Sequence, residues 1–377
     1  QTPVFMEIIA RYVGNGFYID HSYANICIYF WYNVACFEQN LIERYLNSKK
    51  TNQPYNGIIP LNPLLSATAS SFLMPILVDF IEKIDEKNTS VDDVQQNPEP
   101  YMYSTMTIAA LYRLNPPVIF EYLKDKINEN MSKDKWTNIH AGIQMIYAIA
   151  GEPLSDNVGI FIAHHFETLL LATKPNQVPR LRETALFVIS LIIKNYPKII
   201  TQAGEFTDKR INDIIDSIEP TLQLNDEEKN NISYDNRQIF IRYSNIISNL
   251  SYAWKANMYE SHLDIFFDKF YLIYGSLFNF GIINGDHMLI RESGSALDCL
   301  IFNSTPKNLN KIDLLYSQTL EMLSKSKKFY CSQEIIFMIQ SSLCSNIKTI
   351  LLKLKNNPSK GKEIISKYVE QTLSIFY

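Results

Sequence analysis

The sequence predicts an all-α protein, an α-α superhelix that belongs to the HEAT-repeat class of solenoids. Residues 135–150 and 179–193 read as two similar helices, each of which opens with polar residues, passes a small residue (Ala141, Ala185) and then becomes apolar. A third apolar helix is expected between them, at 157–172. No run of four or more residues shows the clean period-two alternation of a half-buried strand. Alternating helices that recur along a chain, each too apolar to stand alone, are typical of α-solenoids.

The chain opens with an expected helix pair at 2–12 and 22–46, and the second helix is rich in aromatic side chains. The polar stretch 49–60 follows and contains Pro54 and Gly57. Proline and glycine interrupt helical periodicity, so this stretch is expected to be a loop.

Three further helices are expected before the 135–150 helix. They lie at 64–84, 102–114 and 118–128. Pro75 predicts a kink in the first of them, or a start after it. Pro116 and Pro117 stop the second helix and start the third, because proline suits a first helical turn. The stretch 86–100 has no apolar periodicity and is expected to be an exposed, mildly acidic loop.

The second half continues the alternation. Helices are expected at 199–224, 236–254, 259–278, 287–302, 309–327, 332–355 and 362–377, with a charged loop at 226–231. We therefore expect one continuous HEAT-repeat solenoid over 1–377, with about seven helix pairs. Solenoids normally close with a polar-faced capping repeat, and neither end of the sequence offers one, so a piece of a longer chain is expected.

The second helices of these pairs carry the clearest repeat signal. Arg182-Glu183-Thr184-Ala185 and Arg291-Glu292-Ser293-Gly294 match in the order of their charges and in the small residues that follow. Equivalent positions lie roughly 40 to 60 residues apart, and the lower end of that interval suits HEAT repeats.

The composition excludes several classes of function. A net charge of -4 argues against a nucleic-acid surface. The sequence has no phosphate-binding glycine loop, no zinc-binding histidine or cysteine motif and no nucleophile elbow, so no cofactor and no catalysis are expected. His164 and Glu167 share one helical face, but a metal site needs at least one more ligand.

The five cysteines form no CxxC pair and are expected to be free, buried thiols in a reducing compartment. No signal peptide is visible, and no stretch of about 18 apolar residues lacks a polar break. We expect a soluble, intracellular protein that does not insert into membranes.

A series of short motifs runs through the chain in a fixed order. They are 28–34 with Glu38, the acidic loop after Ile84, 133–136 with 149–153, 182–185 with 195–197, 236–250, 289–293 and 341–344. Each motif is weak alone, but the ordered series resembles the central HEAT-repeat region of the importin-β (karyopherin-β) family. The resemblance covers nearly the whole chain and is best between Met102 and Trp254.

The resemblance implies a nuclear import receptor that moves between cytoplasm and nucleus through the nuclear pore. In that family, the inner helices bind basic cargo or the basic segment of an importin-α-type adaptor. Ran-GTP binding releases the cargo, and outer grooves bind FG nucleoporins. No direct binding of nucleic acid is implied.

The resemblance also supplies candidate site residues. The cargo-binding candidates are Trp136, Asp134, Asn138, Glu183 and Asn245, and the acidic-loop candidates for Ran or cargo are Glu86, Asp92, Asp93 and Glu99. An exposed indole can stack on the stems of Arg or Lys, and the polar neighbours of Trp136 favour a surface position over the core. Glu183 has a second interpretation, as the partner of an arginine within the repeats.

The sequence departs from the family at three places. The acidic loop carries only an Asp pair, the tryptophan expected at Phe187 is missing, and the one expected around 244–246 is replaced by small or polar residues. These departures bear on the detailed cargo contacts more than on the fold. Two alternatives stay open beside the import-receptor interpretation. One is another HEAT scaffold, such as a transportin relative or a phosphatase or vesicle-coat scaffold; the other is a helical enzyme with a hidden polar pocket.

Overall fold

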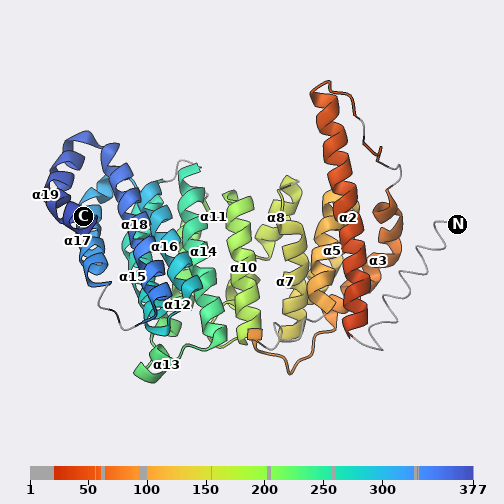
Figure 1. Ribbon diagram of the computed structural model, residues 1–377. Helices are drawn as coiled ribbons and strands as arrows, with labels where there is room; N and C mark the ends of the chain where they lie inside the picture. Colours follow the sequence, from red (N-terminus) through yellow and green to blue (C-terminus); the bar gives the residue numbers. More distant parts are fainter. Residues whose placement is uncertain are drawn as a thin grey trace. The chain divides into compact units, whose positions relative to one another are not determined.

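The computed structural model describes residues 21–55, 57–60, 64–92, 100–153, 155–201, 205–256, 260–326, 329 and 331–376 (Figure 1). Over these residues the chain is helical and contains no strand, which confirms the all-α prediction. The chain divides into two compact units, Gln1–Ala172 (unit 1) and Thr173–Tyr377 (unit 2). A single continuous solenoid across both units stays a prediction, and the expected helix at 2–12 lies outside the described residues.

Unit 1 is built from helices that pack in two rows. Its elements are α2 (His21–Lys50), α3 (Leu65–Glu82), α5 (Pro100–Leu114), α6 (Pro116–Met131), α7 (Trp136–Ala150), α8 (Asp156–His164) and α9 (Phe166–Ala172). Helices α2, α5 and α7 pack side by side, while α3 packs against α5 and α6 against α7. Pro75 lies inside α3 without ending it. Each pair thus buries the apolar stripe that neither helix could bury alone.

The helix expected at 157–172 is broken into α8 and α9 at His165. The His165 ring is buried, and its Nε2 forms a 2.9 Å hydrogen bond with Asn128 Oδ1 on α6. The helix break at His165 is thus stabilised by a contact with α6. The local apolar pattern of 157–172 could not indicate that contact.

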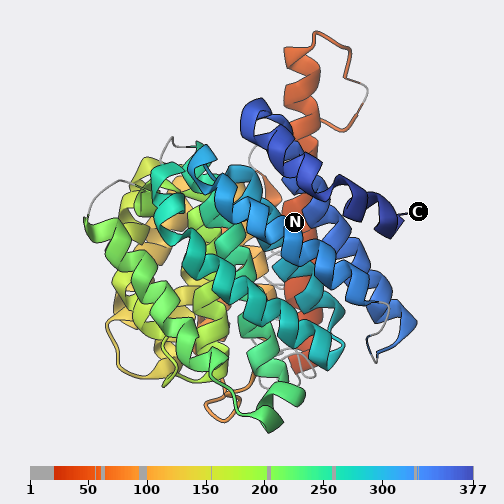
Figure 2. The same ribbon diagram turned by 90° about the vertical axis from the view of Figure 1, so that its left-hand side faces the viewer.

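Unit 2 repeats the two-row arrangement. Its elements are α10 (Pro179–Asn195), α11 (Lys198–Thr201), α12 (Glu205–Leu222), α13 (Asp226–Asn230), α14 (Tyr234–Ala256), α15 (Glu260–Asn284), α16 (His287–Asn303), η1 (Pro306–Asn308), α17 (Leu309–Ser326), α18 (Gln333–Lys355) and α19 (Pro358–Phe376). Helices α10, α14, α16 and α18 pack in sequence and form what we call the second-helix row. Helices α12, α15, α17 and α19 form the first-helix row. Lys269 Nζ on α15 donates to Asn212 Oδ1 on α12, Lys311 on α17 pairs with Asp268 on α15, both at 2.8 Å, and α17 packs against α19. Figure 2 shows the cyan-to-blue helices of both rows lying alongside one another.

The prediction of a charged loop at 226–231 is wrong, because these residues form the short helix α13. Asn225 Oδ1 accepts from the backbone N–H of Glu228, and the Asn225 N–H donates to Glu228 Oε2, both at 2.9 Å. This reciprocal capping box satisfies two N–H groups at the start of the helix. The expected helix at 199–224 is likewise replaced by α11 and α12.

Side-chain amides join successive helices of the second-helix row, one half-buried (Asn249) and one fully buried (Asn346). Asn249 Nδ2 on α14 donates to Ser190 O at 3.0 Å and to Ser190 Oγ at 2.8 Å on α10. Asn346 Nδ2 on α18 donates to Gly294 O at 3.0 Å and to Asp298 Oδ1 at 2.9 Å on α16. A buried amide must find partners, so these bonds fix the register of one helix on the next.

By length and hydropathy alone, α3 and α18 could each cross a lipid bilayer. In the structure, α3 packs against α5, and α18 packs against α16, α17 and α19. Leu73 of α3 and Ile350 of α18 are fully buried. Both helices therefore contribute to the core of their units, while the absence of membrane insertion stays a prediction.

The five cysteines are free, which confirms that part of the prediction. Each is half-buried, so the expectation of full burial is wrong.

Candidate partner-binding faces

One face of the second-helix row of unit 2 is not covered by the first-helix row. On α14 its members are spaced by three or seven residues, which places them on one side of the helix, while Phe240, Ile246 and Leu250 point into the core. We call this surface the unit 2 face. Its members are Glu183, Phe187, Lys194, Arg242, Asn245, Tyr252, Lys255, Arg291, Phe302 and Lys348.

Arg242 on α14 occupies a seat made by two residues of α10. Its Nε donates to Glu183 Oε1 at 2.6 Å, and its guanidinium lies 4.3 Å from the centroid of the Phe187 ring. The Arg242 and Glu183 side chains are 25% and 14% exposed, so the pair is shielded from water on most sides. A carboxylate beside an aromatic ring is the combination that would hold an arginine of a basic partner. In this chain, Arg242 itself occupies the position between Glu183 and Phe187. Glu183 is therefore the partner of an arginine within the repeats, which is the second interpretation that the sequence analysis gave for it.

The two matched motifs on α10 and α16 place their arginines differently. Arg182 is buried, and its Nε donates to Thr173 O at 3.1 Å. It lies close to Tyr243, whose hydroxyl is 2.6 Å from Ser217 Oγ, and burial raises the pKa of Tyr243 to about 12. Arg291 is exposed instead and pairs with its neighbour Glu292 at 2.8 Å. The motif therefore repeats in sequence but not in contacts.

In unit 1, Trp136 lies at the first position of α7 and is half-buried. Its ring meets the His140 ring edge-on, with centroids 6.2 Å apart. Asp134, just before α7, is exposed. Asn138 is already engaged, because its Nδ2 donates to Asn130 Oδ1 at 3.2 Å and Asn130 Nδ2 donates to Glu82 Oε1 at 2.8 Å. Asp134 is thus exposed to solvent and Trp136 keeps part of its surface exposed, whereas Asn138 links α7 to α6.

The described part of the acidic loop also comes to the head of α7. The Glu86 carboxylate forms an ion pair with Lys135 Nζ. The Asp92 backbone N–H donates to Ser90 Oγ at 3.1 Å. Asp93 and Glu99 lie outside the described residues. Of the predicted residues, the structure brings Glu86 to Lys135, which lies between Asp134 and Trp136. In unit 2, Glu183 contacts Arg242, and Asn245 lies half-buried three residues further along α14.

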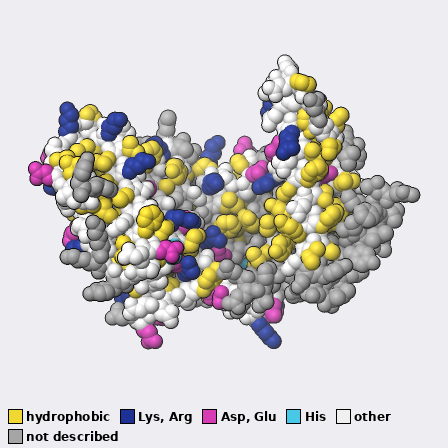
Figure 3. Space-filling view, in the orientation of Figure 1, with side chains coloured by type: hydrophobic (Ala, Val, Ile, Leu, Met, Phe, Trp, Pro, Cys, Tyr) yellow, Lys and Arg dark blue, Asp and Glu magenta, His cyan; other side chains and the backbone are white. Residues whose placement is uncertain are grey.

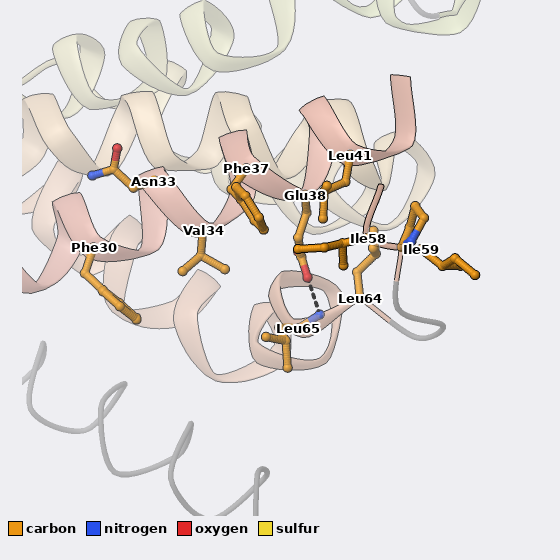
Figure 4. A pocket seen from close by; sticks show the side chains of 11 residues that line it. Phe30, Asn33, Val34, Phe37, Glu38, Leu41, Ile58, Ile59, Leu64 and Leu65 are labelled. Carbon is orange, nitrogen blue, oxygen red and sulfur yellow. Dashed lines mark hydrogen bonds between the residues drawn. The ribbon is translucent and has the colours of Figure 1, made fainter. Parts of the chain in front are cut away.

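An apolar pocket of about 430 Å³ lies between α2 and the start of α3 (Figure 4). The lining side chains include Phe30, Val34, Phe37, Leu41, Ile58, Ile59 and Leu65. Glu38 shapes one end, where its buried carboxylate accepts from the N–H groups of Leu65 at 2.6 Å and Ser66 at 3.1 Å. That bond caps the first turn of α3 and orders the wall of the pocket. Ile58 and Ile59 come from a stretch that the sequence indicated only as a loop.

Sequence reasoning missed the bases and rings of the unit 2 face. Lys255 Nζ lies 4.2 Å from the centroid of the Phe302 ring, and Tyr252 is largely exposed beside it. The spacing of Tyr252 and Lys255, three residues apart on α14, was the sequence pattern that could have indicated this surface. In the part of the chain that the structure describes, no three potential metal ligands lie together, and His164 is exposed.

Comparison with known proteins gives a match in structure but none in sequence. No protein-family model matches the chain, and no curated protein matches it. Importin β crystallised in a polyethylene glycol condition matches 99% of this chain with a TM-score of 0.69 and 15% identity. The Kap95:Nup1 complex matches 98% with a TM-score of 0.72 and 13% identity, and yeast importin-β (Kap95p) matches 94% with a TM-score of 0.64 and 14% identity.

The matches cover 42%, 39% and 40% of those three chains, so this chain spans about two fifths of their length. At such identities the likeness establishes the fold alone. The chain has the HEAT-repeat fold of the karyopherin solenoids.

Proposed function

We propose that the chain is the partner-binding part of a nuclear import receptor of the importin-β kind, a carrier without catalytic activity. The observation that carries the proposal is a match to importin β over 99% of the chain at a TM-score of 0.69. The motifs that resemble the family run in the same order along this chain. Such a receptor would work in both cytoplasm and nucleus and would pass through the nuclear pore.

Basic cargo, or the basic segment of an importin-α-type adaptor, would bind unit 1 at the head of α7. Trp136 is half-buried there and offers an indole edge and face to the stem of a lysine or arginine. Asp134 supplies an exposed carboxylate beside it. Glu86 is available once Lys135 releases it, an exchange that costs little because both side chains are solvent-exposed. In unit 2, Glu183 would become available to a basic partner only when Arg242 leaves it.

FG nucleoporins would place a phenylalanine ring in the pocket between α2 and α3. Its wall is aliphatic and aromatic, and its volume of about 430 Å³ accommodates a phenyl ring. The neighbouring Kap95 structure is a complex with Nup1, which supports this kind of partner. A second neighbouring structure holds Kap95p with RanGDP, which supports Ran as a partner.

Binding of three purified partners to the immobilised protein tests this function. We expect retention of an importin-α-type basic segment, retention of an FG-repeat segment, and release of the basic segment by Ran-GTP but not by Ran-GDP. A general phosphatase or coat scaffold predicts none of these. If the protein retains neither the basic segment nor Ran-GTP, the proposal is overturned.

A further inference from the structure

We infer that the unit 2 face docks an acidic segment of a protein partner that also carries apolar side chains. The inference does not rest on the proposed transport role. It follows from where the chain places its own charges and rings, and it assigns to this surface the opposite charge preference from that of the head of α7.

Charge is unevenly divided between the two rows of unit 2. The helices of the second-helix row, α10, α14, α16 and α18, together contain ten Lys and Arg but five Asp and Glu. The helices of the first-helix row, α12, α15, α17 and α19, contain eight Lys and Arg against twelve Asp and Glu. The whole chain carries a net charge of -4, so the basic row stands out against an acidic background. Figure 3 shows dark blue groups recurring over α14 and α18.

The carboxylates in the middle of the second-helix row are satisfied within the chain. Glu183 is paired with Arg242, and Glu292 with Arg291 at 2.8 Å. Asp298 accepts from Ser345 Oγ at 2.7 Å and from Asn346 Nδ2 at 2.9 Å. A basic partner would have to break these contacts before it gained a carboxylate, whereas an acidic partner leaves them intact.

Several lysines of the same face are exposed and free of ion pairs. Lys194, Lys255 and Lys348 are exposed, and among the described residues none of them has a carboxylate within ion-pair distance. The helix dipole favours a lysine in the last turn of any one helix and so accounts for Lys194 and Lys255. It does not account for Lys348, which lies about two turns before the end of α18.

Exposed rings lie between these bases. Phe302 on α16 carries the Lys255 ammonium over its ring, and Tyr252 on α14 is largely exposed. A surface that alternates lysines with rings fits a segment that alternates carboxylates with apolar side chains, because both kinds of contact form together. A long polyanion such as RNA is disfavoured, since the acidic first-helix row lies alongside and repels it.

Fluorescence anisotropy with the whole chain tests the inference. The probe is a short labelled peptide in which glutamates alternate with leucine and phenylalanine. The comparison probes are the same peptide with lysine in place of glutamate, and a single-stranded RNA of similar charge. We expect the acidic peptide to bind the protein, with an affinity that falls as salt is added.

The double variant Lys255→Glu/Lys348→Glu should weaken acidic-peptide binding by about tenfold. The neutral double variant, with glutamine at both positions, should weaken it less. The matched control Lys307→Glu/Lys325→Glu reverses two exposed lysines of unit 2 that lie off the face, and should leave binding unchanged. Three results would each overturn the inference. The first is tighter binding of the lysine peptide than of the acidic peptide, and the second is binding of RNA without binding of the acidic peptide. The third is equal affinity of Lys255→Glu/Lys348→Glu and Lys307→Glu/Lys325→Glu for the acidic peptide. Binding to Ran-GTP and to FG repeats is measured separately, so failure here leaves the transport proposal standing.

Discussion

The guanidinium of Arg242 lies 4.3 Å over the ring of Phe187, on a different helix of the same unit. The sequence resemblance leads to a tryptophan at this position, as a holder for the basic side chains of cargo. The chain has a smaller ring there and covers it with its own cation, while Glu183 binds the same guanidinium from the side. A site expected to receive a basic partner is thus already occupied.

Arg242→Ala should lower the free energy of unfolding of unit 2 by about 1 to 2 kcal/mol, because a shielded ion pair and a cation–π contact are lost together. Arg242→Lys should recover only part of the loss, since an ammonium has no flat plane to lie on the ring while it donates to Glu183. Urea denaturation of both variants and of Glu183→Gln measures this. If the double variant Arg242→Ala/Glu183→Gln loses as much stability as the two single variants added together, the two residues are not coupled.

Phe37→Glu should weaken binding of an FG-repeat segment with little change in melting temperature. Phe37 lines the pocket between α2 and α3, yet its side chain is 56% exposed, so the folded state buries little of it. Leu46→Glu is the matched control, because Leu46 is similarly exposed on α2 and does not line the pocket. Equal FG binding by the two variants would remove the pocket from the proposed function.

Gly361→Ala should destabilise unit 2 by about 1 to 3 kcal/mol, because a new methyl group would overpack the junction of α18 and α19. A Cβ at this position would lie within van der Waals overlap of the Leu354 carbonyl, 2.1 Å from its oxygen, and backbone cannot rotate away. Gly275→Ala in α15 meets nothing within 4 Å and should be neutral or mildly stabilising, as alanine favours helix. Similar melting temperatures for both variants would contradict this packing.

His165→Gln should reduce the loss of stability on acidification. Burial, and secondarily the charge of His164, lowers the pKa of His165 below its ordinary value. As the pH falls through about 6.5, His165 becomes protonated in the unfolded chain but stays neutral in the folded chain. The free energy of unfolding therefore decreases as the pH falls. Glutamine can still bond Asn128 but does not titrate. Denaturation at neutral and mildly acidic pH should give a smaller difference for the variant than for the unmodified chain, and equal differences would contradict the assignment.

Helix positions could be read from the sequence wherever a local signal marked them. Pro179 begins α10 as predicted, and His287 begins α16, because proline and apolar periodicity act within a few residues. The break at His165 depends on Asn128 in another helix, and no local pattern records it. Helix α13 is a different case, since the charged stretch 226–231 predicts a loop, although the capping residues Asn225 and Glu228 are visible in the sequence.

The candidate site was less predictable, because it depends on contacts between residues far apart in the sequence. Glu183 was identified from its motif, but its partner Arg242 lies on the next helix of the row. Exposure also differs between equivalent motif positions, with Arg182 buried and Arg291 exposed. The cargo roles of Trp136, Asp134 and Asn245 stay predictions.

The fluorescence of Trp136 gives the most direct measurement of cargo binding. Of the three tryptophans in the chain, Trp31 and Trp254 are fully buried and Trp136 is half-buried, so a partner at the head of α7 would change the surroundings of Trp136. Titration with an importin-α-type basic segment should change the emission in a saturable way, and Ran-GTP should reverse the change. Trp136→Ala should weaken binding of the segment while keeping the melting temperature close to that of the unmodified chain. An emission that does not respond to the basic segment, or a Trp136→Ala variant that binds it with unchanged affinity, would contradict the account.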